Sequence, residues 1–375
     1  MNTIELPEQD KNTPSVLIVT DAWKPQTNGV VTTVTNTRHQ LKRKGFRLYT
    51  LTPSYFKLHL PTYDPGVKVA IPSMSAIAKY FRKFQPDYIF IMTEGPLGLA
   101  IRHFCIEARL PFTTAFATKW PDYLKQHLFI PRKITWRMTH WFHAPAHAVM
   151  VATQSLRNEL KAHGLHNIQP WTRGVDTKVF KRVSPEERAA FHPDCPRPFY
   201  IYAGRVSSEK NIEAFLSLDL PGTKIVVGKG ADLEALKIRY PAVIFKGLLT
   251  GKALATCYAC SDIFVFPSKT DTFGLVMLEA MASGLPVVAF NVTGPADVID
   301  EDAQASQIGF LASSDERLRE LAIKAWETLK NNTDLPLKCR HYVLQHYSWQ
   351  VVADMLVNNL KRCTVEMKTH YLEVT

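Results

Sequence analysis

Short apolar runs recur along the whole chain, and between most of them lies a longer stretch with helical spacing. In the first half the runs lie at residues 15–20, 46–51, 67–71, 88–92, 112–116 and 148–153. A second series follows the Pro-rich segment HPDCPRP, at residues 199–204, 224–228, 243–247, 262–267 and 286–290. Alternation of short buried strands with crossover helices predicts an α/β protein with parallel sheets covered on both faces.

The length of 375 residues exceeds the usual size of one hydrophobic core. We therefore expect two doubly wound, Rossmann-like domains, residues 1–180 and residues 181–349, with an amphipathic closing helix in residues 350–375 that packs back on either domain. In such folds ligands bind at the carboxyl ends of the strands, so we expect the site in a groove that faces both sheets.

Several features bear on the class of protein. The chain contains no run of about 18 uninterrupted apolar residues, so no membrane-spanning helix is expected. The first residues, MNTIELPEQDKNTP, are polar and acidic, which is unlike a secretory signal. Of the six cysteines only Cys257 and Cys260 are close in sequence, and without a second ligand pair they indicate packing in a helix. These features predict a cytoplasmic, reducing location.

The net charge of +11 is unevenly distributed. Residues 1–180 carry 23 Lys and Arg against 11 Asp and Glu, whereas residues 181–375 carry 22 against 23. The excess is either a solubilising surface or a surface for anionic lipid or a phosphorylated acceptor. No recognised nucleic-acid module is present, so no nucleic-acid partner is predicted.

The stretch FVFPSKTDTFGLVMLEAMASGLPVVAF places two carboxylates, Asp271 and Glu279, around the start of a helix that follows a strand. A carboxylate next to free N–H groups at a helix N-terminus suits anions and hydroxylated ligands. Glu279 lies in an otherwise apolar helix, where a buried acid needs a partner. The N–H groups at the helix start belong to Phe273, Gly274 and Leu275.

Two further strand ends carry glycines and cations. In YAGRVSSEKN the strand ends at Gly204, and Arg205 and Lys210 follow at the mouth of the sheet. Two cations there suit a diphosphate, because Arg donates parallel N–H bonds and Lys adds a point charge; a solvated helix start is the alternative. In VVGKGADLE, Gly228 and Gly230 form either a phosphate-binding turn or an ordinary strand-to-helix turn.

The loop DAWKPQTNGVV, after the first apolar run, contains Gly29 at the start of a helical stretch. A glycine there lets a phosphate approach the backbone, where the helix N-terminus favours negative charge. An ordinary turn is the alternative interpretation.

Together these segments resemble glycosyltransferase family 4, the retaining nucleotide-sugar transferases of GT-B fold, and within it the bacterial GDP-mannose-dependent α-mannosyltransferases and the sulfoquinovosyl-type lipid glycosyltransferases. The resemblance covers nearly the entire chain. Its segments are the NGV loop, EGPLGLA, RGVDTKVF, GRVSSEKN and SKTDTFGLVMLEAMASGLPV.

The resemblance implies a role for each matching residue. The Gly29 N–H would meet the donor phosphate, and Arg205 and Lys210 would hold the diphosphate as it leaves. Asp271 would contact sugar hydroxyls and Glu279 the ribose hydroxyls. The donor-binding residues would also include Gly204, Gly228, Gly230 and the N–H groups of Phe273, Gly274 and Leu275.

The resemblance also implies the reaction. A hexose of mannose or glucose type would move from a GDP- or UDP-linked sugar, bound by the second domain, to a lipid-linked or saccharide acceptor bound by the first. A departing phosphate oxygen would take the acceptor proton, so no metal, no separate cofactor and no dedicated base are expected.

One position departs from the family pattern. In AFATKWPDYL the residue at the place of the family's histidine is Ala117, and Thr118, Lys119 or His127 are the nearby substitutes. A catalytically impaired nucleotide-sugar-binding protein therefore stays open as an alternative, as does a GT-B phosphorylase.

The stretch of residues 119–143 is basic and aromatic. It favours contact with the acceptor and with the anionic inner face of a membrane, and a core helix with a solvated basic face is the alternative. Its residues are Trp120, Trp136 and Trp141 with Lys125, Arg132, Lys133 and Arg137.

Overall fold

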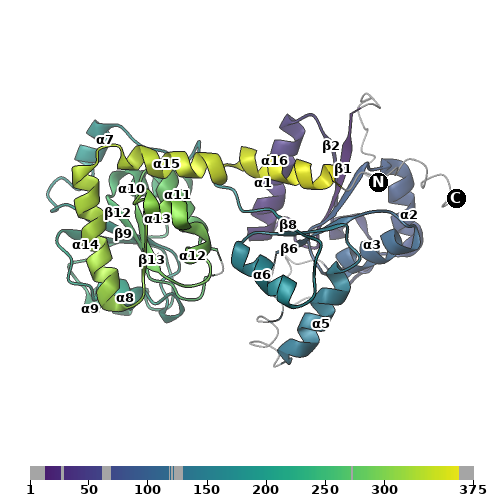
Figure 1. The fold of residues 1–375 in the computed structure, drawn as a ribbon, viewed down its shortest axis with the longest axis horizontal. Coiled ribbons are helices and arrows are strands. Elements are labelled where there is room, and N and C mark those ends of the chain that lie inside the picture. The colour runs from purple at the N-terminus through teal and green to yellow at the C-terminus, as the bar shows by residue number, and fades with distance from the viewer. Residues whose placement is uncertain are drawn as a thin grey trace. The chain divides into compact units, whose positions relative to one another are not determined.

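The computed structural model describes residues 13–26, 29–60, 69–117, 119, 121, 130–271 and 273–362. The chain forms two compact units (Figure 1). Unit 1 comprises Met1–Thr172 with Val352–Thr375, and unit 2 comprises Arg173–Val351. The division falls after Thr172, whereas the sequence suggested residue 180.

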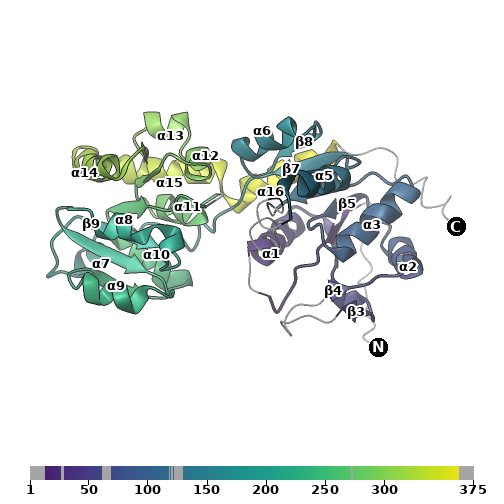
Figure 2. The same ribbon diagram turned by 90° about the horizontal axis from the view of Figure 1, so that it is seen from below.

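Unit 1 is built on a six-stranded sheet of order β2-β1-β5-β6-β7-β8, in which every neighbouring pair is parallel. Helices flank the sheet (Figure 2). The strands are β1 (Ser15–Val19), β2 (Arg47–Leu51), β5 (Tyr88–Ile91), β6 (Thr113–Phe116), β7 (Ala148–Val151) and β8 (Ile168–Pro170). The helices are α1 (Gly29–Arg43), α2 (Met74–Phe84), α3 (Pro96–Glu107), α5 (Arg132–His143) and α6 (Gln154–Ala162), with a 3-10 turn at Pro53–Tyr55.

The segment of residues 67–71 is a correction to the predicted strand series. Its described part, β4 (Val69–Ala70), pairs antiparallel with β3 (His59–Leu60) and lies outside the parallel sheet. Pro61, Pro65 and Pro72 lie close to β4 in the sequence. Proline lacks the N–H that a central strand must donate, which disfavours a longer strand here. The sequence also missed β8, whose run IQP is short and ends in proline.

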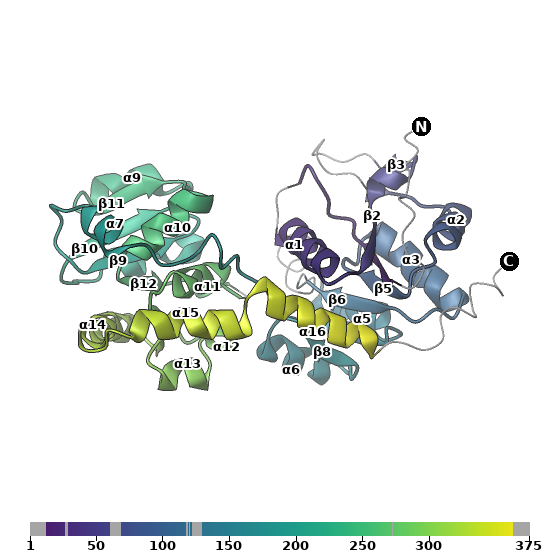
Figure 3. The same cartoon turned by 90° about the horizontal axis from the view of Figure 1, so that it is seen from above.

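Unit 2 repeats the architecture with a parallel sheet of order β11-β10-β9-β12-β13-β14 (Figure 3). Its strands are β9 (Phe199–Ala203), β10 (Thr223–Val227), β11 (Ile244–Gly247), β12 (Ile263–Phe266), β13 (Val287–Phe290) and β14 (Gly309–Ala312). The helices are α7 (Pro185–Ala190), α8 (Ile212–Leu216), α9 (Leu233–Arg239), α10 (Gly251–Cys260), α11 (Leu275–Ala282), α12 (Pro295–Val298), α13 (Glu301–Ala305), α14 (Asp315–Asn331) and α15 (Leu335–His346), with a 3-10 turn at Ser208–Lys210. The last strand, β14, was not anticipated from the sequence.

Both faces of the unit 2 sheet are buried, which explains why its strands are apolar without alternation. On one face Ile201 and Phe264 belong to a core with α10, α11 and α15. On the other face Tyr200 and Val265 pack with α8 and α14. Cys257 and Cys260 are buried free thiols in α10, so they pack as the sequence indicated.

The closing helix α16 (Trp349–Lys361) starts in unit 2, and from Val352 onward it belongs to unit 1. The Trp171 Nε1–H donates to the Val352 carbonyl (3.2 Å), and the Asn359 amide donates to the Pro170 carbonyl (2.9 Å). No helix among the described residues is both long enough and apolar enough to cross a bilayer.

Candidate functional site

The carboxyl ends of β9 and β12 bring together the predicted diphosphate cation and the predicted sugar-binding acid. The two strands are neighbours in the sheet, so the loops that follow them meet. The Lys210 ammonium lies 3.0 and 3.1 Å from the two carboxylate oxygens of Asp271. The pair is partly exposed, with 19% and 26% of the side-chain surfaces accessible. A ligand at this edge can therefore reach both groups.

Arg205 lies on the same loop and is mostly solvent-exposed. Its guanidinium is 3.8 Å from the Glu209 carboxylate, and Lys210 Nζ is also 3.8 Å from that carboxylate. Glu209 thus contacts both cations and was missing from the predicted site. The sequence contains the clue, because Glu209 directly precedes Lys210 and lies four residues after Arg205. An acid so close to two loop cations is expected to pair with them when no anion competes.

Three contacts hold this loop in place. The Tyr202 hydroxyl donates to the Arg205 carbonyl (2.7 Å), the Ser208 N–H donates to Asp232 (2.6 Å), and the Asn211 amide donates to a backbone carbonyl after β12 (3.1 Å). A loop fixed at these points presents its cations in a defined geometry, which lowers the entropic cost of binding.

Packing accounts for three of the predicted donor-binding glycines. A side chain at Gly228 would lie 1.8 Å from the Gly204 carbonyl oxygen, and one at Gly230 would lie 1.9 Å from the Val206 carbonyl oxygen. One at Gly204 would lie 2.8 Å from the Tyr202 hydroxyl. The Gly228 N–H already donates to Gly247, and the Gly204 N–H donates to Val227. These glycines allow two loops to pass closely, and the N–H groups of Gly204 and Gly228 are engaged within the protein.

The start of α11 has a left-handed glycine at its N-cap, a residue that has no side chain with which to cap the helix. Gly274 has φ +79°, and a Cβ there would lie 2.6 Å from Met277 Cε. N–H groups in the first turn of an α-helix have no acceptor within the helix, and the helix dipole favours an anion there. Phe273 packs edge-on against Tyr347 (6.3 Å between ring centroids), and Leu275 is exposed.

Glu279 lies on the face of α11 that packs on α10. The buried Tyr258 hydroxyl is 3.4 Å from its carboxylate, which is the partner that the sequence required. Burial raises the pKa of Glu279 to about 7, and the Tyr258 hydroxyl partly offsets that rise. Burial and the nearby carboxylate raise the pKa of Tyr258 well above its usual value. Near neutral pH, Glu279 is therefore poised between its neutral and ionised forms.

In unit 1, Gly29 begins α1 and is exposed. A Cβ at Gly29 would have no atom within 4 Å and would need no left-handed backbone. The Gly29 carbonyl accepts from the Thr33 hydroxyl inside the helix (2.7 Å). Neither packing nor backbone conformation among the described residues requires a glycine at this position.

Asp21, directly after β1, was also missing from the predicted site. Its carboxylate accepts from the Leu97 N–H (2.9 Å), the Gly98 N–H (3.2 Å) and the Thr93 hydroxyl (2.8 Å) at the start of α3. Burial raises the pKa of Asp21, and these hydrogen bonds limit the rise. A Cβ at Gly95 would lie 2.4 Å from the Asp21 carboxyl carbon, so the motif EGPLG has a structural explanation.

A buried histidine lies behind this edge of the unit 1 sheet. His143, at the end of α5, has its Nδ1 2.8 Å from the Thr114 hydroxyl and its Nε2 3.3 Å from the Glu94 carboxylate. Its side chain is fully buried. It is therefore a fixed link between α5, β6 and the loop after β5, and it cannot replace a histidine at Ala117 that touches a ligand.

The basic stretch of the first half is only partly an exposed surface. Trp136 was predicted as an interfacial residue and is instead 8% exposed, stacked on His163 with ring centroids 3.8 Å apart. It is buried because α5 presents that face to β6 and α6. Trp141 is exposed, as are Arg132, Lys133 and Arg137. Trp120 and Lys125, like Thr118 and His127, lie outside the described residues.

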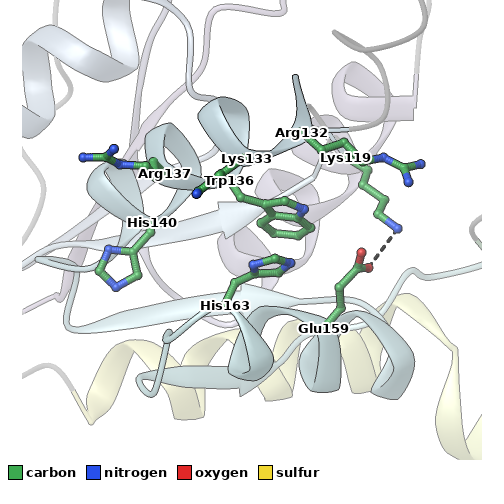
Figure 4. A pocket seen from close by; sticks show the side chains of 8 residues that line it. All are labelled: Lys119, Arg132, Lys133, Trp136, Arg137, His140, Glu159 and His163. Atoms are coloured by element: carbon green, nitrogen blue, oxygen red, sulfur yellow. Dashed lines mark ion pairs between the residues drawn. The ribbon is translucent and has the colours of Figure 1, made fainter. Parts of the chain in front are cut away.

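A pocket of about 700 Å³ lies between α5 and α6 (Figure 4). We call it the α5–α6 pocket. The exposed cations of α5 line it together with Lys119, which follows β6 and pairs with Glu159 of α6 at 2.8 Å. Among the described residues, no group of three or more His, Cys, Asp and Glu side chains is arranged to hold a metal ion.

Comparison with known protein families covers most of the chain. Residues 27–179 match the family model "Glycosyltransferase Family 4", and residues 197–331 match "Glycosyl transferases group 1". The GDP-mannose-dependent alpha-mannosyltransferase of Corynebacterium glutamicum is 26% identical over 366 residues, which cover 89% of this chain and 88% of the relative. The sulfoquinovosyl transferase SQD2 of Arabidopsis thaliana is 33% identical over 262 residues, 66% of this chain and 51% of the relative.

Among solved structures, Anabaena HepE in complex with UDP and glucose superposes with a TM-score of 0.68. The match covers 93% of this chain and 100% of that one at 16% identity. A likeness at this identity concerns the fold alone, and it confirms the two parallel-sheet units of the GT-B fold.

Proposed function

Because the chain belongs to glycosyltransferase family 4, we propose that it transfers a hexose of mannose or glucose type from a nucleotide diphosphate sugar to an acceptor hydroxyl, with retention of the anomeric configuration. The donor is GDP- or UDP-linked and is a substrate, so no separate cofactor takes part. The acceptor is lipid-linked or a saccharide. The names of two relatives, which specify mannosyl transfer from GDP-mannose and sulfoquinovosyl transfer, support this class of reaction.

The observation that carries the proposal is the contact between Lys210 and Asp271 beside the start of α11. A diphosphate is a stronger anion than one carboxylate and competes for the Lys210 ammonium. Its arrival releases Asp271 to accept hydrogen bonds from sugar hydroxyls. The N–H groups at the start of α11 add favourable dipoles at the same place.

The chemistry follows from charge neutralisation. The bond between the anomeric carbon and the β-phosphate oxygen breaks as negative charge develops on the diphosphate, and Lys210 and Arg205 stabilise that charge. The anomeric carbon becomes oxocarbenium-like. The acceptor oxygen then forms the new bond from the face that the diphosphate leaves, so configuration is retained.

The proton balance needs no further group. The acceptor hydroxyl loses its proton to the departing phosphate oxygen as the new bond forms, and the products are the glycoside and the nucleoside diphosphate. Neutralisation by side-chain cations and helix N–H groups takes the part that a divalent metal plays elsewhere. We therefore expect transfer in the presence of a chelator.

A donor and acceptor screen tests the function. Purified full-length protein is incubated with GDP-mannose, UDP-glucose and related donors, with lipid and saccharide acceptors, with and without EDTA. We expect nucleoside diphosphate release that requires an acceptor, and an α-linked product from an α-linked donor by NMR. A β-linked product would refute retention, and strict dependence on added metal would refute the metal-independent mechanism.

Contact with an anionic membrane is a second part of the proposal. Ile134, Met138 and Trp141 lie one turn apart along α5 and are 50%, 57% and 57% exposed. Lys133 and Arg137 lie beside this apolar stripe. An exposed apolar stripe bordered by cations is typical of a helix that lies in the membrane interface. This arrangement favours peripheral binding at the inner face of the membrane.

Vesicle sedimentation tests the membrane contact. Binding to anionic vesicles should weaken with salt and with alanine at Lys125, Arg132, Lys133 and Arg137 together, because each cation near an anionic surface adds attraction. Zwitterionic vesicles serve as the control. Sedimentation of the variant equal to that of the wild type would contradict the membrane contact.

A nucleotide-sugar-binding protein without transfer activity is the second candidate, and Ala117 favours it. Ala117 directly follows β6, and nearby Lys119 is engaged with Glu159. This candidate predicts thermal stabilisation by a nucleotide sugar without turnover of any acceptor. Turnover that appears only in the Ala117→His variant would support it, and turnover by the unmodified protein would exclude it.

A further inference from the structure

The α5–α6 pocket has a strongly positive lining. Among the lining residues that the structure describes, the four cations Lys119, Arg132, Lys133 and Arg137 stand against one acid. That acid, Glu159, is already paired with Lys119 at 2.8 Å. Over these described lining residues the balance is three positive charges when the histidines are neutral.

Stability of α5 does not explain this clustering. Arg132 and Lys133 occupy the first turn of α5, where the helix dipole disfavours cations, and that turn contains no acid. Lys133 and Arg137 lie four residues apart on the helix, a spacing at which like charges repel. Within the described residues, neither Lys133 nor Arg137 has an ion-pair partner. The positions of Lys133 and Arg137 therefore cost the free protein stability, which an anionic ligand would restore.

The pocket also has a rigid wall. Trp136 stacks between Phe116 of β6, with centroids 6.3 Å apart, and His163 after α6, with centroids 3.8 Å apart. Lys119 and Arg132 lie on one side of this stack and Arg137 on the other (Figure 4). The stacked rings fix this wall of the pocket, so the wall needs no rearrangement when a ligand binds.

The position of the pocket links it to transfer. Lys119 follows the carboxyl end of β6, and ligands of doubly wound sheets bind at that edge. A volume of about 700 Å³ accommodates a group larger than an inorganic anion alone. Guanidinium groups bind phosphate through parallel N–H bonds, so the two arginines favour a phosphate.

We propose that the α5–α6 pocket binds a phosphate group of the acceptor, so that the acceptor is a phosphorylated glycan, a glycerol phosphate or a phospholipid headgroup. That the bound molecule is the acceptor rests on the proposed transferase function. That the pocket binds a phosphate does not depend on it. It names a substrate property that the family assignment leaves open.

Titration calorimetry of the full chain with glycerol 3-phosphate tests the site, with glycerol as the neutral probe. We expect glycerol 3-phosphate to bind and glycerol not to bind. The variant Lys133→Gln/Arg137→Gln should weaken binding by about tenfold or more, because each charged hydrogen bond to phosphate contributes at least about that factor. The matched control, Lys42→Gln/Arg43→Gln at the end of α1, removes the same charge from unit 1 and should change the affinity by less than about twofold.

A second pair of probes separates the sources of the phosphate. Vesicles of phosphatidylglycerol are compared with vesicles of phosphatidylcholine. Pocket-dependent binding that is tighter to phosphatidylglycerol vesicles than to glycerol 3-phosphate assigns a lipid headgroup, and equal affinity assigns a soluble acceptor. Absence of binding to both anionic probes, or equal losses in the pocket variant and the control, would overturn the proposal.

Two further measurements keep this inference separate from the proposed function. Circular dichroism and GDP or UDP binding of each variant report whether unit 2 and the fold are intact. The Lys210→Ala variant removes the proposed diphosphate site, and glycerol 3-phosphate binding should survive it unchanged. Loss of binding in Lys210→Ala would place the phosphate in unit 2 and overturn the pocket. Failure of every donor, with pocket-dependent phosphate binding intact, would refute only the transferase.

Discussion

The carboxyl edges of the two parallel sheets share an architecture but satisfy their polar groups differently. In unit 1 the partly buried acid Asp21 accepts three hydrogen bonds from the chain itself, two from N–H groups and one from a hydroxyl. In unit 2 the partly buried acid Glu279 has one hydrogen-bond partner among the described residues, a hydroxyl at 3.4 Å. A buried carboxylate with spare acceptor capacity is suited to a hydroxylated ligand. We therefore expect Asp21 to serve the fold and Glu279 to serve ligand binding.

The glycines show the opposite distribution. In unit 2, Gly228 and Gly230 are required because a neighbouring carbonyl oxygen occupies the place of a side chain. In unit 1, Gly29 has open space around it and an ordinary helical backbone. Where a contact within the protein explains a glycine, no ligand is needed to explain it. Close approach of a phosphate stays the proposed reason for Gly29, with an ordinary turn as the alternative.

The largest expected effect concerns the ion pair of unit 2. Lys210→Ala should lower kcat by about 10²- to 10³-fold, as measured for loss of one preorganised charge-stabilising donor. Nucleoside diphosphate release under saturating donor measures it. Lys237→Ala removes an exposed ion pair on α9 and should leave the rate unchanged. Equal rates for wild type and Lys210→Ala would remove the basis of the proposed mechanism.

A stability measurement tests whether packing in unit 2 requires a glycine at position 228. Gly228→Ala forces a Cβ against the Gly204 carbonyl at a backbone angle of φ +148°. We expect the free energy of unfolding to fall by about 2–4 kcal/mol, in the range of backbone clashes in a core. Urea unfolding followed by circular dichroism measures it. An unfolding midpoint equal to that of the wild type would show that the two loops can separate without cost.

The raised pKa of Glu279 predicts that the free energy of unfolding depends on pH. The pKa of Glu279 is about 7 in the folded protein, against the usual 4.5. The unfolded chain therefore loses this proton first, and the free energy of unfolding falls as pH rises from about 4.5 to about 7. Glu279→Gln removes that loss, which is at most about 3 kcal/mol. The difference between the wild type and Glu279→Gln in urea unfolding at pH 4.5 and pH 8 measures it.

Ionisation of Glu279 should also strengthen nucleotide binding, although it lowers the stability of the fold. Ribose hydroxyls donate to the ionised carboxylate, so GDP or UDP affinity should rise several-fold as pH rises through about 7. The Glu279→Gln variant should lose this dependence. Calorimetry at pH 6 and pH 8 measures both proteins, and an identical pH profile for the variant would assign the ribose elsewhere.

The smallest expected effect concerns Gly29. Gly29→Ala should leave the fold intact or stabilise α1 by up to about 1 kcal/mol, because alanine favours helices. It should weaken donor binding by about tenfold if a phosphate approaches this backbone. Thermal unfolding and donor KM, measured together, separate the two effects. An unchanged KM would make Gly29 an ordinary helix residue.

The fold class was predictable from periodicity, because strands buried on both faces are continuous apolar runs whatever their neighbours. The strand predictions that were wrong or missing concern short apolar runs. Within the predicted run 67–71, Val69–Ala70 form an antiparallel pair with β3. β8 and β14 were missed, since two to four apolar residues do not distinguish a strand from a loop. The pairing of Lys210 with Asp271 was not predictable without the strand order, which places β9 beside β12.

The sequence by itself determined the two parallel-sheet units, the loops that carry charge and the family, because these depend on local spacing along the chain. Only the tertiary structure decided which polar groups are already satisfied. It showed that Asp21 accepts three hydrogen bonds within the protein, that Glu209 lies 3.8 Å from both loop cations and that Trp136 is buried between Phe116 and His163. The physical reason is that hydrogen-bond satisfaction and burial depend on segments far apart in sequence, whose approach is fixed by packing of the whole unit.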